Sequence, residues 1–146
     1  MEIIAINTSE RKGTQKRLVQ SVNLVEKHGI EGDAHAGDWH RQVSFLGKPC
    51  IDEFNKEGAD VKPGAFGENI IVSDVDFTTL PIGSIVKCNG CELEVTQIGK
   101  ECHDRCQIYY KMGNCIMPTN GVFGIVTKGG TISIGDKVEI VKKWIV

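Results

Sequence analysis

The sequence has no long apolar run, few aromatic residues and no excess of charge of one sign. No apolar stretch approaches the roughly 20 residues that a transmembrane helix needs, so we expect no membrane as a partner. Aromatic residues make up 6% of the 146 residues, and no basic stripe alternates with them, which argues against binding of single-stranded nucleic acid. The formal net charge of −2 gives no general attraction to nucleic acid or to an anionic membrane.

Common nucleotide and hydrolase motifs are also missing. The sequence contains no glycine-rich dinucleotide fingerprint and no P-loop, and no nucleophile elbow of an α/β-hydrolase. Residues 1–7 lack the basic and long apolar regions of a signal peptide and are typical of a first strand. We therefore expect a cytoplasmic protein.

The length and composition predict one soluble domain that spans residues 1–146. Hydrophobic residues make up 40% and charged residues 25% of the chain, as in ordinary globular domains. The six cysteines are too sparse for a small secreted disulfide scaffold. In the cytoplasm, unpaired thiols indicate burial, metal binding or catalysis.

The pattern of apolar residues predicts a mainly β protein with a few short helices. Glycine, proline and asparagine separate the runs, and Asn89-Gly90 is typical of a tight hairpin turn. One helix is expected from Pro49 to Gly58, and a less regular helix or turn from Cys102 to Met112. Many short strands favour a β-barrel or sandwich, and the strands are expected at residues 3–6, 19–25, 42–45, 70–72, 84–87, 92–98, 122–127 and 137–141.

The most reactive segment of the sequence is Lys100 to Cys115. Cys102 lies close to Lys100, His103 and Arg105, and such cations favour the thiolate, which is the form that attacks and binds metals. We therefore predict a functional role for Cys102. For Cys106 and Cys115, a resolving thiol, a second ligand and buried packing all remain open.

A second candidate is the loop of residues 29–42. Its glycines, Gly32 among them, allow backbone amides to approach an anion closely. His35, His40 and Arg41 add donors and positive charge that suit a phosphate. Two alternatives stay open: a polar surface loop without function, and a metal site built from Asp33, His35, Asp38 and His40.

A third candidate is the segment of residues 62–70. Gly64 and Gly67 open the backbone, and Glu68 and Asn69 precede an apolar strand. The asparagine amide offers two donors and one acceptor, which suits the edge of a pterin-like ring. The alternative is a bulged turn with a solvated Glu68.

The cysteines also allow a structural zinc site. Cys88 and Cys91, with two residues between them, together with Cys102 and Cys106, can supply four thiolates. Against zinc, the second pair has three residues between its cysteines, and Cys88 and Cys91 flank a hairpin turn where they can simply face each other. A zinc-stabilised, non-enzymatic binding module is therefore the alternative function.

Taken together, these segments resemble the MOSC domain, the C-terminal domain of molybdenum cofactor sulfurases. The resemblance rests on residues 29–44, 63–70, 97–103 and 121–123, whose order and spacing agree over nearly the whole chain. It is closest to the small stand-alone bacterial members. It implies a β-barrel similar to the barrel domain of pyruvate kinase, and a role in handling the molybdenum cofactor or its sulfur.

The resemblance places the family's hallmark cysteine at Cys102. Many relatives have proline before that cysteine, where this chain has Glu101, and one cysteine where this chain has three. The chain is too short to contain the pyridoxal-phosphate desulfurase domain of the sulfurases, so a partner desulfurase would hold any pyridoxal phosphate. Larger relatives reduce N-hydroxylated compounds with an extra β-rich domain, for which this chain has no room.

We therefore predict a domain that binds the molybdenum cofactor (molybdopterin) and handles sulfur, with sulfurtransferase-type activity as a possible reaction. Cys102 would carry a persulfide or bind molybdenum, and the partner would be a cysteine desulfurase or a molybdoenzyme. The residues expected to bind the cofactor are Gly32, Asp33, His35, His40, Arg41, Glu68, Asn69, Lys100, His103 and Arg105.

Overall fold

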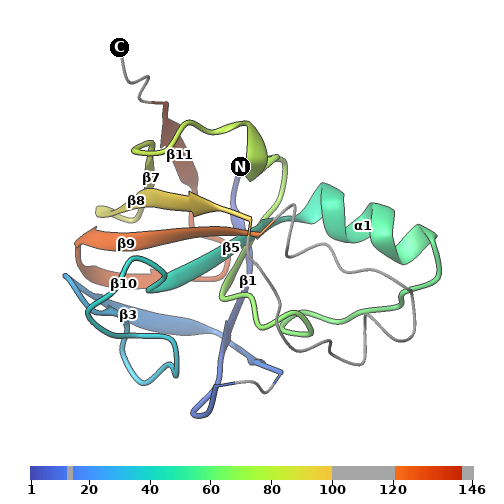
Figure 1. Ribbon diagram of the computed structural model, residues 1–146, viewed down its shortest axis with the longest axis horizontal. Coiled ribbons are helices and arrows are strands. Elements are labelled where there is room, and N and C mark those ends of the chain that lie inside the picture. The colour runs from blue at the N-terminus through green and yellow to red at the C-terminus, as the bar shows by residue number, and fades with distance from the viewer. Residues whose placement is uncertain (13–14, 100–120, 143–146) are drawn as a thin grey trace.

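The protein is mainly β, with one α-helix at the side of the sheets, as a computed structural model shows for residues 1–12, 15–99 and 121–142 (Figure 1). The mainly β prediction is therefore confirmed. The elements in chain order are β1 (Ile3–Thr8), β2 (Arg17–Val19), β3 (Ser21–Val25), β4 (Gly29–Ile30), β5 (Val43–Gly47), α1 (Lys48–Lys56), β6 (Ile70–Val72), the 3-10 helix η1 (Phe77–Thr79), β7 (Ile85–Cys88), β8 (Cys91–Ile98), β9 (Val122–Lys128), β10 (Gly130–Ser133) and β11 (Val138–Val141).

The described strands form two open sheets. The larger sheet has eight strands in the order β11-β7-β8-β9-β5-β6-β1-β2, and the smaller has three in the order β10-β3-β4. Strands β5 and β6 are parallel and are joined by the crossover that contains α1, while the other pairs are antiparallel. The main-chain N–H of Ile3 donates to the carbonyl of Asp136 (2.9 Å), beside an isolated bridge between Glu2 and Lys137. These contacts bring β1 near the start of β11, but they do not close a barrel among the described residues.

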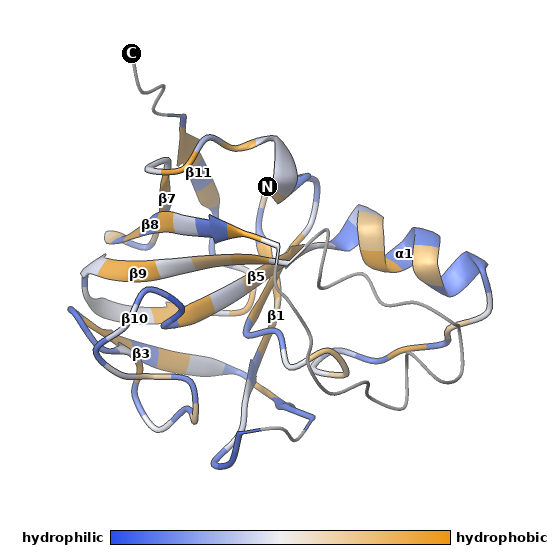
Figure 2. Cartoon of the chain, viewed as in Figure 1, coloured by the Kyte–Doolittle hydropathy of each residue, from blue (hydrophilic) through white to orange (hydrophobic). Residues whose placement is uncertain are grey.

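The core lies between the two sheets and follows the alternation of the strands. In β8, Cys91, Leu93 and Val95 are buried while their neighbours are partly exposed, as expected for a strand with one face on the core. All of β5 is buried, because it has neighbours on both edges and side chains on both faces. Figure 2 shows these apolar bands on the central strands.

Helix α1, predicted from Pro49 to Gly58, covers Lys48–Lys56, so it begins one residue and ends two residues earlier than predicted. Pro49 lies in its first turn, where its missing N–H costs no helical hydrogen bond. Phe54 is buried, and its ring lies 5.8 Å from the ring of Phe66. Beyond the last turn, Gly58 takes a φ of 100°, a conformation that favours glycine.

Most strand predictions are confirmed, with small shifts at their ends. The run predicted at 19–25 is divided at Gln20 into β2 and β3, because its two halves pair with different partners, β1 and β10. Two short strands, β4 and β10, were not predicted. The helix or turn expected from Cys102 to Met112 lies outside the described residues. No helix within the described ranges has the length and apolar character needed to cross a membrane.

Candidate functional site

A buried ion pair lies at the centre of the candidate site. The Nζ atom of Lys16 lies 2.7 Å from Oδ1 of Asp33, and both side chains are fully buried. The main-chain N–H of Ser9, just after β1, donates to the same Oδ1 (3.0 Å). The main-chain N–H of Lys16 donates to the carbonyl of Gly64 (3.0 Å), so the lysine links the loop after β4 to the segment before β6.

The ionisation of Asp33 depends on these contacts. Burial opposes the charged form, but the hydrogen bonds from Lys16 and the Ser9 amide and the positive charge of Lys16 outweigh it, with a further contribution from Asn69. The pKa of Asp33 is therefore lowered below its ordinary value. A negative carboxylate beside a lysine ammonium is thus the stable state of this pair near neutral pH.

His35 completes the network on its outer side. Its Nδ1 lies 2.9 Å from Nζ of Lys16, and its main-chain N–H donates to Oδ2 of Asp33 (3.2 Å). Its side chain is 26% exposed, so the ring lies at the boundary between the buried ion pair and the surface. The indole N–H of Trp39 donates to the His35 carbonyl (2.7 Å), which fixes the main chain at this position.

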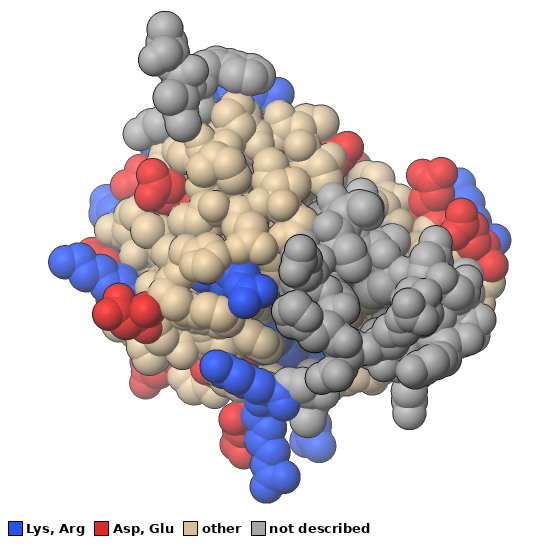
Figure 3. All heavy atoms as spheres, in the orientation of Figure 1, with Lys and Arg blue, Asp and Glu red and all other residues tan. Residues whose placement is uncertain are grey.

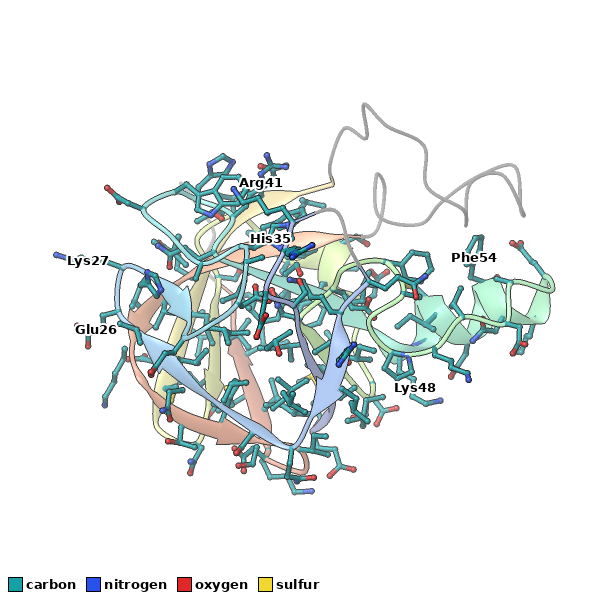
Figure 4. The ribbon with its side chains drawn as sticks, turned by 90° about the horizontal axis from the view of Figure 1, so that it is seen from below. Glu26, Lys27, His35, Arg41, Lys48 and Phe54 are labelled. Atoms are coloured by element: carbon teal, nitrogen blue, oxygen red, sulfur yellow. The ribbon has the colours of Figure 1, made fainter. Side chains whose placement is uncertain are left out.

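Arg41 is held between two aromatic rings. Its Cζ lies 4.7 Å from the ring centroid of Trp39 and 5.7 Å from that of Phe123 on β9. Lys12 approaches the same indole, with Nζ 5.2 Å from the centroid. Within residues 1–12, 15–99 and 121–142, the buried Nε of Arg41 has no hydrogen-bond partner. Figure 4 shows His35 and Arg41 close together, away from Lys48 on α1.

His40 belongs to the same loop but has different partners. Its Nε2 lies 2.6 Å from Oε1 of Gln97 at the end of β8, and its carbonyl accepts a hydrogen bond from the hydroxyl of Thr96. These contacts anchor the loop to β8. Basic side chains are visible in the centre and lower part of the face shown in Figure 3.

Glu68 is fully buried, so the alternative of a solvated Glu68 is wrong. Its Oε2 accepts from the N–H of Gly64 (3.0 Å) and its Oε1 from the N–H of Phe66 (3.1 Å). Burial raises the pKa of Glu68, although these backbone hydrogen bonds and the charge of Lys16 oppose that shift. The side chain thus holds the turn that precedes β6.

Asn69, just before β6, is also fully buried, and its amide bonds to β5 and β1. Its Oδ1 accepts from the main-chain N–H of Ser44 on β5 (3.0 Å), and its Nδ2 donates to the carbonyl of Asn7 on β1 (3.0 Å). Its own N–H donates to the Ser44 hydroxyl (3.0 Å). The same amide also acts on Asp33, so Asn69 connects the candidate site to β1 and β5.

Two of the described cysteines, Cys88 and Cys91, lie on the β7–β8 hairpin. Cys88 and Cys91 face each other across the β7–β8 hairpin, whose turn residues Asn89 and Gly90 have φ of 47° and 78°, as predicted for that turn. Burial raises the pKa of Cys88 to about 12 and also raises that of Cys91. Within the described ranges, no group of three or more histidine, cysteine, aspartate or glutamate residues could hold a metal ion, so the four-residue metal site predicted in the loop is not found.

The remaining predicted site residues cannot be placed. They lie outside the described residues and comprise Lys100, Cys102, His103, Arg105, Cys106 and Cys115. The zinc alternative therefore has only its Cys88–Cys91 half in the described part of the chain.

The structure brings Asp33 and His35 together with the Glu68–Asn69 segment, through a residue that the sequence did not single out. Lys16 contacts Asp33 and His35 directly, and its charge acts on Glu68. Nothing in the basic run around Lys16 distinguishes a buried lysine from the exposed cations beside it. Gly32, with φ of 83°, lets the chain turn into Asp33.

Comparisons with known proteins give a match to one family model and several solved structures of similar fold. The family model described as the MOSC domain matches residues 31–139. A structure of the YuaD protein from Bacillus subtilis has 19% sequence identity and a TM-score of 0.81, and the alignment covers 98% of this chain and 96% of that one. YiiM from Geobacillus stearothermophilus has 19% identity and a TM-score of 0.72, with 97% and 75% covered. YiiM from Escherichia coli has 18% identity and a TM-score of 0.66, with 99% and 71% covered. No curated protein matches the sequence.

Proposed function

Because the chain belongs to the MOSC domain family, which is associated with binding of the molybdenum cofactor, we propose that it binds this cofactor and handles its sulfur. The cofactor carries a phosphate, which needs several donors and positive charge in one place. The loop from Gly32 to Arg41 provides both. A β-barrel fold and a single domain over residues 1–146 are part of the same proposal.

The observation that supports the proposal best is the state of Arg41. The Cζ atom of Arg41 lies 4.7 Å from the ring centroid of Trp39 and 5.7 Å from that of Phe123. The buried Nε of Arg41 has no hydrogen-bond partner among the described residues. A buried donor without a partner costs free energy, and an anionic oxygen would remove that cost. Because arginine binds phosphate through a planar set of N–H groups, a cofactor phosphate fits this side chain.

Five of the predicted residues then divide into two roles. His35, His40 and Arg41 lie on the loop that would contact the phosphate. Glu68 and Asn69 are completely buried and bonded to protein groups, so they would form the floor of the site and fix its shape. The cofactor, when bound, supplies the molybdenum and the pterin, and the protein supplies the anion site.

Sulfur handling is assigned to Cys102. Its thiolate would either bind molybdenum or attack the outer sulfur of a cysteine persulfide on a pyridoxal-phosphate desulfurase partner. In that transfer the S–S bond of the donor breaks, the partner's cysteine leaves as a thiolate, and Cys102 carries the persulfide. Lys100, His103 and Arg105 would favour the thiolate. A molybdoenzyme would be the acceptor of the cofactor.

Titration of the purified protein with molybdenum cofactor tests this function. The variants are Arg41→Ala and Cys102→Ala, with Lys48→Ala on α1 as the control. Loss of one charged hydrogen bond costs about 1.5–3 kcal/mol, so Arg41→Ala should weaken binding by roughly 10- to 100-fold, while Lys48→Ala should bind like the wild type. Cys102→Ala should lose sulfur acceptance from a desulfurase.

Two results would contradict the proposal. If Arg41→Ala binds the cofactor as tightly as Lys48→Ala, the loop does not hold the phosphate. If Cys102→Ala equals the wild type both in cofactor binding and in sulfur acceptance, the cysteine assignment is wrong.

A further inference from the structure

The contact between Lys16 and His35 restricts the chemistry of the histidine ring. A lysine ammonium has three N–H donors and no acceptor. Asp33 lies 2.7 Å from the Lys16 nitrogen in a fully buried pair, which keeps that nitrogen charged. The Nδ1 atom of His35, 2.9 Å from the same nitrogen, must therefore accept the hydrogen bond. An imidazole nitrogen that accepts carries no proton.

We propose that Lys16 is a positioning residue that fixes His35 in the neutral tautomer with its proton on Nε2. The ring then offers an N–H donor at Nε2 and has no free lone pair at Nδ1. The His35 side chain is 26% exposed, so the ring lies at the edge of the buried pair. Lys16 itself remains buried and acts through His35.

The tautomer defines the class of group that His35 can recognise. A donor at Nε2 suits an oxygen acceptor such as a phosphate, a carboxylate or a carbonyl. It does not suit a metal ion, which needs a ring nitrogen without a proton, nor a role as general base. The metal alternative for this loop is thereby disfavoured at His35. The identification of the acceptor with the cofactor phosphate rests on the proposed function, whereas the tautomer does not.

The surrounding contacts keep the ring in place for this role. The Trp39 indole is stacked on the His35 ring with an interplanar angle of 10° and a centroid distance of 6.4 Å. Both the N–H and the carbonyl of His35 are hydrogen-bonded, to Asp33 and Trp39. The main chain and the ring are thus held, and Lys16 determines which nitrogen carries the proton.

Removal of Lys16 should move the proton. Oδ2 of Asp33 lies 4.0 Å from Nδ1 of His35, and a carboxylate can only accept hydrogen bonds. In Lys16→Met the carboxylate of Asp33 loses its ammonium partner. The proton of the His35 ring should then move from Nε2 to Nδ1, from which it can be donated to Asp33. In Lys16→Arg the guanidinium also has donors only, so the proton should stay on Nε2.

Nitrogen-15 NMR of the histidine rings tests the proposal without any ligand. Spectra are recorded at about pH 8, where histidine is mainly neutral, and the His35 signals are identified by their loss in His35→Gln. The exposed His28 is the internal reference for a ring that exchanges between both tautomers. Wild type and Lys16→Arg should show His35 in the Nε2–H form alone, and Lys16→Met should show Nδ1–H. The matched control is Lys12→Met, which removes a cation near Trp39 and should leave His35 unchanged.

Two outcomes would overturn the inference. The first is a wild-type spectrum in which His35 has its proton on Nδ1 or shows the same mixture of tautomers as His28. This result would overturn the inference even if Lys16→Met does not fold. The other is a folded Lys16→Met with an unchanged His35. If the tautomers behave as expected but the molybdenum cofactor does not bind, the proposed function fails while the role of Lys16 stands.

Discussion

Breaking the buried ion pair should destabilise the protein far more than breaking an ion pair of similar length on its surface. Lys16→Met removes the charge but keeps an unbranched side chain of similar length. It leaves Asp33 with a negative charge in a fully buried position. The comparison is Lys48→Met, which removes the 2.6 Å pair between Lys48 and Asp52, whose side chains are 50% and 49% exposed.

The expected magnitudes follow from burial. Removal of one partner from a buried pair costs about 3–5 kcal/mol. In Lys16→Met, Asp33 retains hydrogen bonds from the main-chain amides of Ser9 and His35. Because these bonds still stabilise the carboxylate, we expect a loss of about 3 kcal/mol in the free energy of unfolding, at the lower end of this range. The exposed pair on α1 should contribute about 0.3–0.5 kcal/mol. Because a domain of this kind has about 5–15 kcal/mol of stability, Lys16→Met should still leave a folded population.

Urea denaturation of a double-mutant cycle provides the measurement. The four proteins are the wild type, Lys16→Met, Asp33→Asn and the double variant. In the double variant no charge is buried without a partner, so it should be more stable than the sum of the single changes implies. The coupling free energy should lie at the upper end of the usual 0.5–3 kcal/mol range.

The reasoning fails if the two single changes are additive. It also fails if the losses in free energy of unfolding of Lys16→Met and Lys48→Met differ by less than about 1 kcal/mol, because an exposed ion pair contributes no more than that. Either result would mean that the Lys16 ammonium is solvated and that the network does not depend on it.

Three further predictions concern pH, a glycine and the cysteines. The pKa of Asp33 is lowered from its ordinary value of 3.8, so the ionised carboxylate stabilises the fold above that value. This contribution is lost as the pH falls through the lower pKa of the folded state. Below about pH 4, the stability of Asp33→Asn against urea should therefore fall less steeply with pH than that of the wild type. In thermal unfolding, Gly64→Ala should lose clearly more stability than Gly58→Ala. Both glycines have a positive φ, but a Cβ at Gly64 would lie 2.0 Å from a main-chain oxygen, whereas a Cβ at Gly58 would have no heavy atom within 4 Å. Equal costs, near the 1–2 kcal/mol of left-handed strain alone, would contradict the clash. Burial raises the pKa of both hairpin thiols, that of Cys88 to about 12. Iodoacetamide should therefore label Cys88 and Cys91 at pH 8 only after the protein is unfolded. If the purified protein instead contains stoichiometric zinc that is lost in Cys88→Ser, the zinc-stabilised module is favoured.

Local sequence signals predicted the elements well. The alternation of residues 92–98 predicted β8, and Asn89-Gly90 predicted the hairpin that begins it. These signals depend on neighbours in the sequence. The division of residues 19–25 was missed because it depends on which strands the two halves pair with, and pairing partners are distant in the chain.

The residues of the candidate site follow from the sequence only in part, for the same reason. The loop of residues 29–42 was proposed as a site because of its glycines, histidines and arginine. Lys16 was not, because its burial results from contacts with Asp33 and Gly64 that exist only in the folded chain. The sequence singled out Asn69, but the hydrogen bonds of its fully buried amide to β5 and β1 depend on the topology.

The position of β1 and Lys16 also bears on where the functional unit begins. The family match starts at residue 31, yet β1 pairs with β6, and Lys16 lies upstream of the match as well. A fragment trimmed to the matched residues would lose the sheet neighbour of β6 and would leave Asp33 buried without its cation. We therefore expect a stably folded fragment of this protein to need residues 1–30 in addition to the residues of the family match.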